Sequence, residues 1–182
     1  MPPRPKFTKE EVISAALEIV RAQGADALTA RELGARLGAS ARPIFTLFKS
    51  MEEVKAGVLE RGMAFFSALQ KEELAKGKYP PYKAIGMAYI RLAAEEKRLF
   101  QLLFMRDRTG EAPGEPDPVI GTVIKQTGLS EEEARRFHAE MWVCVHGIAA
   151  MLATSYLEWD HQEISVMLTD LYEGLKGRYQ HE

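Results

Sequence analysis

The stretch that decides the fold is residues 29–49, TARELGARLGASARPIFTLFK, which has the pattern of two short helices joined by a tight turn. Thr29 is the expected N-cap of the first helix, and the Glu32 carboxylate is placed to accept a hydrogen bond from the Thr29 backbone N–H. Gly38 is expected to end that helix, because glycine adopts the left-handed conformation without steric cost. Ser40 is the expected N-cap of the second helix.

The second of these helices has one apolar side and one mixed side when it is laid out at helical spacing. Ile44, Leu47 and Phe48 share the side that is expected to pack against the first helix. The other side carries Ala41, Arg42, Phe45, Thr46 and Lys49. These side chains suit a DNA major groove. Arg42 could contact guanine, Lys49 could hold a phosphate, and Phe45 or Ala41 could contact a thymine methyl group. An ordinary helix pair with a solvated outer side fits the same pattern.

The run LTARELGARLGAS and the IF, LFKS and EEV groups after it give residues 7–58 a resemblance to the DNA-binding domain of the TetR family of bacterial transcriptional regulators. The resemblance implies a recognition helix over residues 40–49. The expected DNA-binding residues are Thr29 and Arg31 on phosphates, together with Ser40, Ala41, Arg42, Pro43, Phe45, Thr46 and Lys49. Two positions depart from the family pattern, since Phe45 replaces a common tyrosine and Leu47 a common tyrosine or histidine. Neither replacement can donate a hydrogen bond to a phosphate.

Composition places the chain among ordinary globular proteins, with 182 residues, 46% hydrophobic and 27% charged. Residues 1–56 hold 9 Lys and Arg against 7 Asp and Glu, a net charge of +2, and residues 57–182 hold 15 against 19, a net charge of −4. A weakly basic head on an acidic body fits a DNA-facing module. The single cysteine, Cys144, agrees with a reducing cytoplasm. With no visible signal peptide or membrane-spanning run, we expect a soluble cytoplasmic protein without a membrane partner.

Apolar periodicity and five candidate capping boxes predict an all-α, TetR-like chain of about nine helices, with a three-helix helix-turn-helix domain followed by a helical bundle. The boxes begin at Thr8, Thr29, Ser50, Ser130 and Asp160. Glycines and prolines make residues 107–118 the one clear loop. We expect the DNA-binding domain over residues 1–54 and a ligand-binding and dimerisation domain over residues 55–182.

The last two long helices carry more apolar side chains than one inner face requires. The expected homodimer interface consists of Ile148, Met151, Leu152, Ile164, Met167, Leu168, Leu171 and Leu175. Two helices from each partner would form a four-helix interface, whose twofold axis presents two recognition helices to a pseudo-palindromic operator. The dimer follows chiefly from the resemblance. Periodicity alone does not separate an interface from a monomer core.

The segment MWVCVHGIAAM, residues 141–151, places Trp142 and His146 one turn apart on one helical side, followed by Gly147. With YIRLAAEEKRLFQLLF upstream, this spacing resembles the regulatory domain of a TetR subfamily named for its Trp-His-Gly motif. The resemblance implies a small-molecule effector pocket inside the bundle. The candidate lining residues, which suit an apolar or aromatic compound, are Phe66, Leu69, Met87, Phe100, Leu103, Phe104, Met141, Trp142, Val145 and His146. Ordinary core packing with a satisfied histidine is the alternative.

The sequence contains no HExxH, paired-cysteine, GxSxG, GxGxxG or phosphate-loop pattern. We therefore predict no enzymatic activity, no metal and no cofactor. The leading hypothesis is a homodimeric repressor that binds a double-stranded DNA operator and is released by a small effector. The alternative is an all-α small-molecule-binding or partner-binding protein that has lost specific DNA binding, an outcome raised by Phe45 and Leu47.

Overall fold

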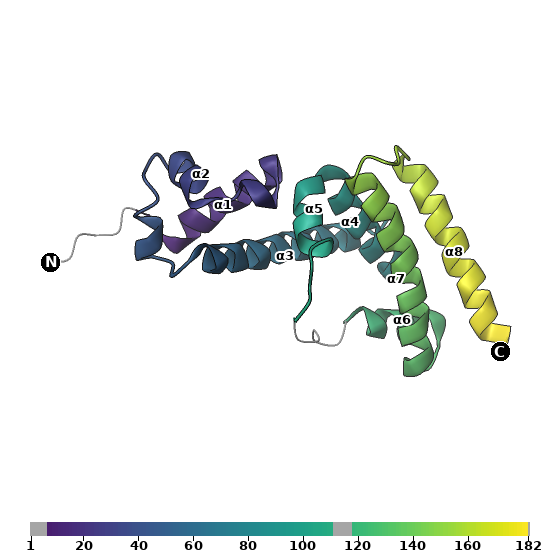
Figure 1. Cartoon of the computed structure of the whole chain (residues 1–182). Coiled ribbons are helices and arrows are strands. Elements are labelled where there is room, and N and C mark those ends of the chain that lie inside the picture. The colour runs from purple at the N-terminus through teal and green to yellow at the C-terminus, as the bar shows by residue number, and fades with distance from the viewer. Residues whose placement is uncertain (1–6, 111–117, 182) are drawn as a thin grey trace. The chain divides into compact units, whose positions relative to one another are not determined.

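The computed structural model describes residues 7–110 and 118–181, and over these ranges the chain is all-α, without a strand (Figure 1). The eight α-helices are α1 (Lys9–Gln23), α2 (Ala30–Arg36), α3 (Met51–Ala75), α4 (Pro81–Glu95), α5 (Lys97–Phe104), α6 (Val119–Thr127), α7 (Glu131–Ala153) and α8 (His161–His181). Two 3₁₀ helices, η1 (Ala25–Ala27) and η2 (Ile44–Thr46), lie among the first three of them. The predicted all-α class is confirmed, and the count of about nine helices is close. Most of the expected loop over residues 107–118 lies outside the described residues.

The chain divides into two compact units. Unit 1 comprises the described residues up to 67 together with residues 96–106, and unit 2 comprises residues 68–95 with the described residues from 107 onward. The long helix α3 contributes residues to both units. The domain boundary expected at residue 54 stays a prediction.

Three of the predicted capping boxes form as expected and explain where α1, α7 and α8 begin. Their reciprocal pairs are Thr8 with Glu11, Ser130 with Glu133, and Asp160 with Glu163. In each pair the cap side chain accepts a backbone N–H three residues on, and the glutamate carboxylate accepts the N–H of the cap residue, at 2.7 to 2.8 Å. Each box satisfies two N–H groups that a helix leaves unpaired at its start.

The other two boxes differ from the prediction. Thr29 caps α2 by accepting the Glu32 N–H at 3.1 Å, but no return bond from that carboxylate is present in the described chain. At the start of α3, the Glu53 carboxylate accepts the Lys49 N–H at 2.7 Å rather than the N–H of Ser50. Glu53 also pairs with Lys9 at 2.8 Å, which ties this end of α3 to α1.

The core of unit 1 is formed by fully buried side chains of α1, α2, η2 and α3, among them Val12, Leu33, Ile44 and Val54. A Cβ added to Gly57 would lie 2.5 Å from the Ile13 side chain, so glycine allows α3 to pack closely on α1. In unit 2, α7 packs against α4, α6 and α8. None of the helices within the described ranges is long and apolar enough to cross a membrane.

Candidate functional site

The segment that follows α2 is not the α-helix expected over residues 40–49. Only Ile44–Thr46 forms a helix, and it is the 3₁₀ helix η2. Its hydrogen bonds span three residues, from the Ile44 N–H to the Ala41 carbonyl at 3.1 Å and from the Thr46 N–H to the Pro43 carbonyl at 3.3 Å. Proline disfavours the α conformation for the residue before it, which works against a helix that begins at Ser40.

The two sides of this segment are nevertheless those that the sequence predicts. Ile44 and Phe48 are buried, and Leu47 packs partly against the same core. The exposed residues are Arg42, Phe45, Thr46 and Lys49, with Ala41 and Pro43 half-buried. The burial of Ile44 and Phe48 therefore holds the segment on unit 1 and keeps its opposite side at the surface.

Gly34, in the middle of α2, sets the position of this segment, and the sequence reasoning missed it. A Cβ at Gly34 would lie 3.0 Å from the backbone of Ala39, Ser40 and Ala41. The Gly34 carbonyl also accepts the Ala39 N–H at 2.9 Å. A glycine inside a short helix costs about 1 kcal/mol relative to alanine, and this cost was the signal of a packing role that the sequence offered. Gly38, at φ +63°, makes the predicted left-handed turn.

The exposed cations of unit 1 fall into two groups. Arg36 pairs with Glu18, and Arg21 pairs with Glu96. Arg31, in the first turn of α2, and Arg42, before η2, are exposed and have no ion pair among the residues that the structure describes. These two guanidinium groups are therefore available to an external anion or a base edge.

The structure places the ten residues expected to line an effector pocket in two groups. Phe66, Phe100, Leu103 and Phe104 belong to unit 1, and Leu69, Met87, Met141, Trp142, Val145 and His146 belong to unit 2. In unit 1, the Phe104 ring centroid lies 5.4 Å from both the Phe66 and the Phe100 centroids. The expectation that the ten residues line one pocket stays a prediction.

In unit 2, two tyrosine–histidine pairs join α4 to α7, and one of them contains His146. His146 Nδ1 lies 2.8 Å from the Tyr89 hydroxyl, and His138 Nδ1 lies 2.9 Å from the Tyr82 hydroxyl. Burial lowers the pKa of His146 and raises the pKa of Tyr89. Sequence reasoning missed both tyrosines. Their seven-residue spacing on α4, beside an eight-residue histidine spacing on α7, is the signal that was available.

Trp142 stacks on His146, with ring centroids 4.9 Å apart and an interplanar angle of 12°. The predicted one-turn relation of these residues is therefore present. Trp142 is nevertheless 47% exposed, so its indole forms part of the surface of the chain.

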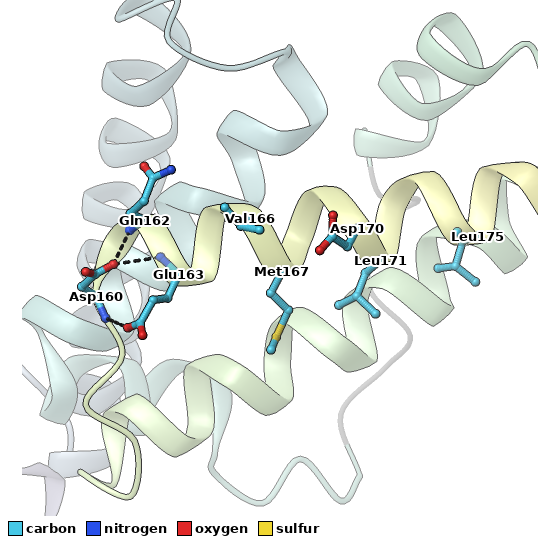
Figure 2. Close-up of a pocket in the computed structure, with 9 residues that line it drawn as sticks. Asp160, Gln162, Glu163, Val166, Met167, Asp170, Leu171 and Leu175 are labelled. Atoms are coloured by element: carbon cyan, nitrogen blue, oxygen red, sulfur yellow. Dashed lines mark hydrogen bonds between the residues drawn. The ribbon is translucent and has the colours of Figure 1, made fainter.

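An open groove of about 820 Å³ runs along α8. Figure 2 shows the side chains that line it. It is lined by Asp160, Gln162, Glu163, Val166, Met167, Asp170, Leu171, Gly174 and Leu175. Three residues of the expected dimer interface, Met167, Leu171 and Leu175, lie on this groove, and a fourth, Met151, is exposed on α7. The other four, Ile148, Leu152, Ile164 and Leu168, are buried within the chain itself.

The described residues contain no group of three or more side chains arranged to hold a metal ion.

Two family models match the chain. Residues 12–56 match the model for bacterial regulatory proteins of the tetR family, and residues 82–172 match the model for the tetracyclin repressor-like C-terminal domain. The first match contains Gly34 and η2, and the second contains the tyrosine–histidine pairs. Among curated proteins, none matches the chain significantly. The Trp-His-Gly subfamily is not confirmed and stays a prediction.

Proposed function

Since this chain belongs to the TetR family and is a DNA-binding transcription regulator, we propose that it is a repressor that binds a pseudo-palindromic operator as a homodimer and leaves it on binding a small apolar or aromatic effector. The observation that carries the proposal is the exposed side of residues 41–49, held outward by the burial of Ile44 and Phe48. That side enters the major groove in the proposed complex.

The charges around this side support distinct roles for three cations. Arg42 is exposed and unpaired within the described chain, and its guanidinium matches the two acceptors of a guanine edge. Arg31, at the start of α2, and Lys49, after η2, are also exposed. In the proposed complex these two side chains contact phosphates. Arg42 thus supplies sequence preference, while Arg31 and Lys49 supply affinity.

Arg42→Ala is expected to relax base preference at one position of each half-site by roughly 5- to 150-fold, since it removes a bidentate base contact. Lys49→Ala is expected to weaken binding to all duplexes by a similar factor and to reduce the salt dependence of binding. Gel-shift titrations against an operator panel at two salt concentrations measure both effects. An Arg42→Ala protein with unchanged base preference would contradict the assigned readout.

A salt-titrated shift assay on the DNA flanking the chain's own gene separates the two functions under consideration. Steep salt dependence with a preference over random duplex supports the regulator. Equal binding to random duplex would instead favour a small-molecule-binding or partner-binding protein that has lost specific DNA binding.

The exposed side of α7 and α8 supports a homodimer. Gly147 and Gly174 have no atom within 4 Å of an added Cβ, so packing within the chain does not explain these costly helix-interior glycines. Val143, one turn before Gly147, is 64% exposed, and Val166, which lines the groove of α8 with Gly174, is 50% exposed. In the proposed dimer these exposed apolar side chains and the groove on α8 pack against the same two helices of a second copy.

The effector site is proposed to include the Trp142–His146 stack and the Tyr89 hydroxyl bound to it. These groups offer flat aromatic surface with polar atoms at its edge, which suits an apolar or aromatic compound. Release follows only if the effector binds one packing of the helices more tightly than the DNA-bound packing.

Trp142→Ala is expected to raise the concentration of effector needed for release by roughly 10-fold, the effect of losing one stacking ring. Operator affinity should stay unchanged, because a side chain 47% exposed leaves no closed cavity when truncated. The measurement is operator release by aromatic compounds that release the unmodified protein. Tyr156→Ala, which removes another exposed aromatic ring, serves as the control. Unchanged release, or loss of folding, would remove Trp142 from the effector site.

A further inference from the structure

The exposed side of residues 41–49 offers the DNA a largely apolar surface. Phe45 is 47% exposed, and its ring contacts no other ring or cation in the described chain. Ala41 and Pro43, which are half-buried, have no polar side-chain atom. Phe45 thus places an aromatic ring at the surface, between Arg42 and Lys49 in the sequence.

The hydroxyl of Thr46 does not offset this apolar character. Thr46 Oγ1 donates its hydrogen to the Pro43 carbonyl at 2.6 Å. A threonine hydroxyl has a single hydrogen, so Thr46 has none left to donate to a base or a phosphate. Of the side chains exposed between residues 41 and 46, Arg42 alone can donate a hydrogen bond to DNA.

The one apolar feature that base pairs display in the major groove is the methyl group on C5 of a pyrimidine. The other base edges there present donors and acceptors, which an aromatic ring would desolvate without replacing their hydrogen bonds. We infer that Phe45 reads a pyrimidine C5-methyl group beside the base contacted by Arg42. This inference rests on the proposed function, because it requires residues 41–49 to face the major groove.

The recognised chemistry is the methyl group rather than thymine as a whole. A cytosine methylated at C5 presents the same group at the same place in the groove. Methylation of an operator cytosine at the position read by Phe45 therefore strengthens binding, and operator occupancy depends on the methylation state of the DNA.

The test uses a duplex selected by the protein from a random library. Replacing thymines one position at a time by deoxyuridine removes only the methyl group. At one position we expect the binding affinity to fall about fourfold when one half-site is changed and about 15-fold when both are changed. The fourfold loss corresponds to one methyl group that is no longer removed from water. At the same position, the thymine–adenine pair can be exchanged for cytosine–guanine. Methylating that cytosine at C5 should then raise the binding affinity by about the same factor.

Protein variants assign the effect to Phe45. Phe45→Ala should bind the thymine and deoxyuridine duplexes equally, whereas Phe45→Tyr, which keeps the ring, should retain the difference. Lys49→Ala should weaken both duplexes and leave their ratio unchanged. The inference would be overturned if the protein showed sequence preference but no deoxyuridine effect. It would also be overturned if Phe45→Ala kept the affinity ratio between the thymine and deoxyuridine duplexes. Either result would leave the proposed function unaffected. Absence of any sequence preference would instead overturn the proposed function.

Discussion

Gly34→Val is expected to weaken operator binding by at least roughly 100-fold while the protein stays folded, because base readout fails when the contacting side chains are displaced by about 1 Å. A Cβ at this position already lies 3.0 Å from three backbone atoms of the segment that follows α2. The two further methyl groups of valine can be accommodated only if residues 39–41 move away and the Ala39-to-Gly34 hydrogen bond lengthens from 2.9 Å. Residues 41–49 then leave their position on unit 1.

The expected cost in folding stability is smaller than the loss in binding. Overpacking of this kind costs about 1–3 kcal/mol, against a typical total of about 5–15 kcal/mol. Gly38→Ala is the matched control, because a Cβ added at Gly38 has no atom within 4 Å. The positive φ of this residue makes alanine strained there, but nothing forces the following segment to move. Thermal melting of each variant beside a gel-shift titration separates folding from binding. Operator binding by Gly34→Val equal to that of the unmodified protein would contradict the assigned role of this glycine.

Val166→Glu is expected to convert the proposed homodimer to monomers at micromolar concentration and to weaken operator binding by at least roughly 100-fold, since each monomer would engage only one half-site. Val166 is 50% exposed on the groove of α8, beside Glu163 and Asp170. A further carboxylate buried there in a dimer would lack a partner and would face acidic neighbours, which costs several kcal/mol for each copy. In the isolated chain the same carboxylate remains in water.

Sedimentation or light scattering measures the mass of the Val166→Glu protein, and gel shift measures its operator affinity. Leu74→Glu introduces the same charge at a side chain that is 40% exposed near the end of α3 and does not line the groove, and it should leave both unchanged. A Val166→Glu protein that remains dimeric would move the interface elsewhere.

Helix starts could be predicted from sequence where the signal is local. Thr8, Ser130 and Asp160 each form a capping box with a glutamate three residues on, and no distant contact is required. The buried side of residues 44–48 could also be predicted, because Ile44 and Leu47 share one side in either a 3₁₀ or an α-helix, and the Phe48 N–H returns to the Ile44 carbonyl at 3.0 Å as in an α-helix. For the same reason, the apolar spacing could not distinguish the two helix types.

The remaining features depend on contacts between distant parts of the chain. The role of Gly34 requires knowing how closely the following turn returns to α2, and the tyrosine–histidine pairs require the register of α4 against α7. The residues of the expected dimer interface could not be divided from sequence into buried and exposed members. Ile164 faces the core of its own chain and Met167 lies on the groove, although both continue the same apolar pattern on α8.

The most direct measurement is selection of duplexes from a random library by the unmodified protein, followed by sequencing and determination of the mass of the bound complex. We expect an enriched inverted repeat with half-sites about one helical turn apart, or a multiple of it, bound by two copies of the chain. Enrichment of no sequence over the starting library, or of a single unrepeated site bound by one copy, would contradict the proposed function.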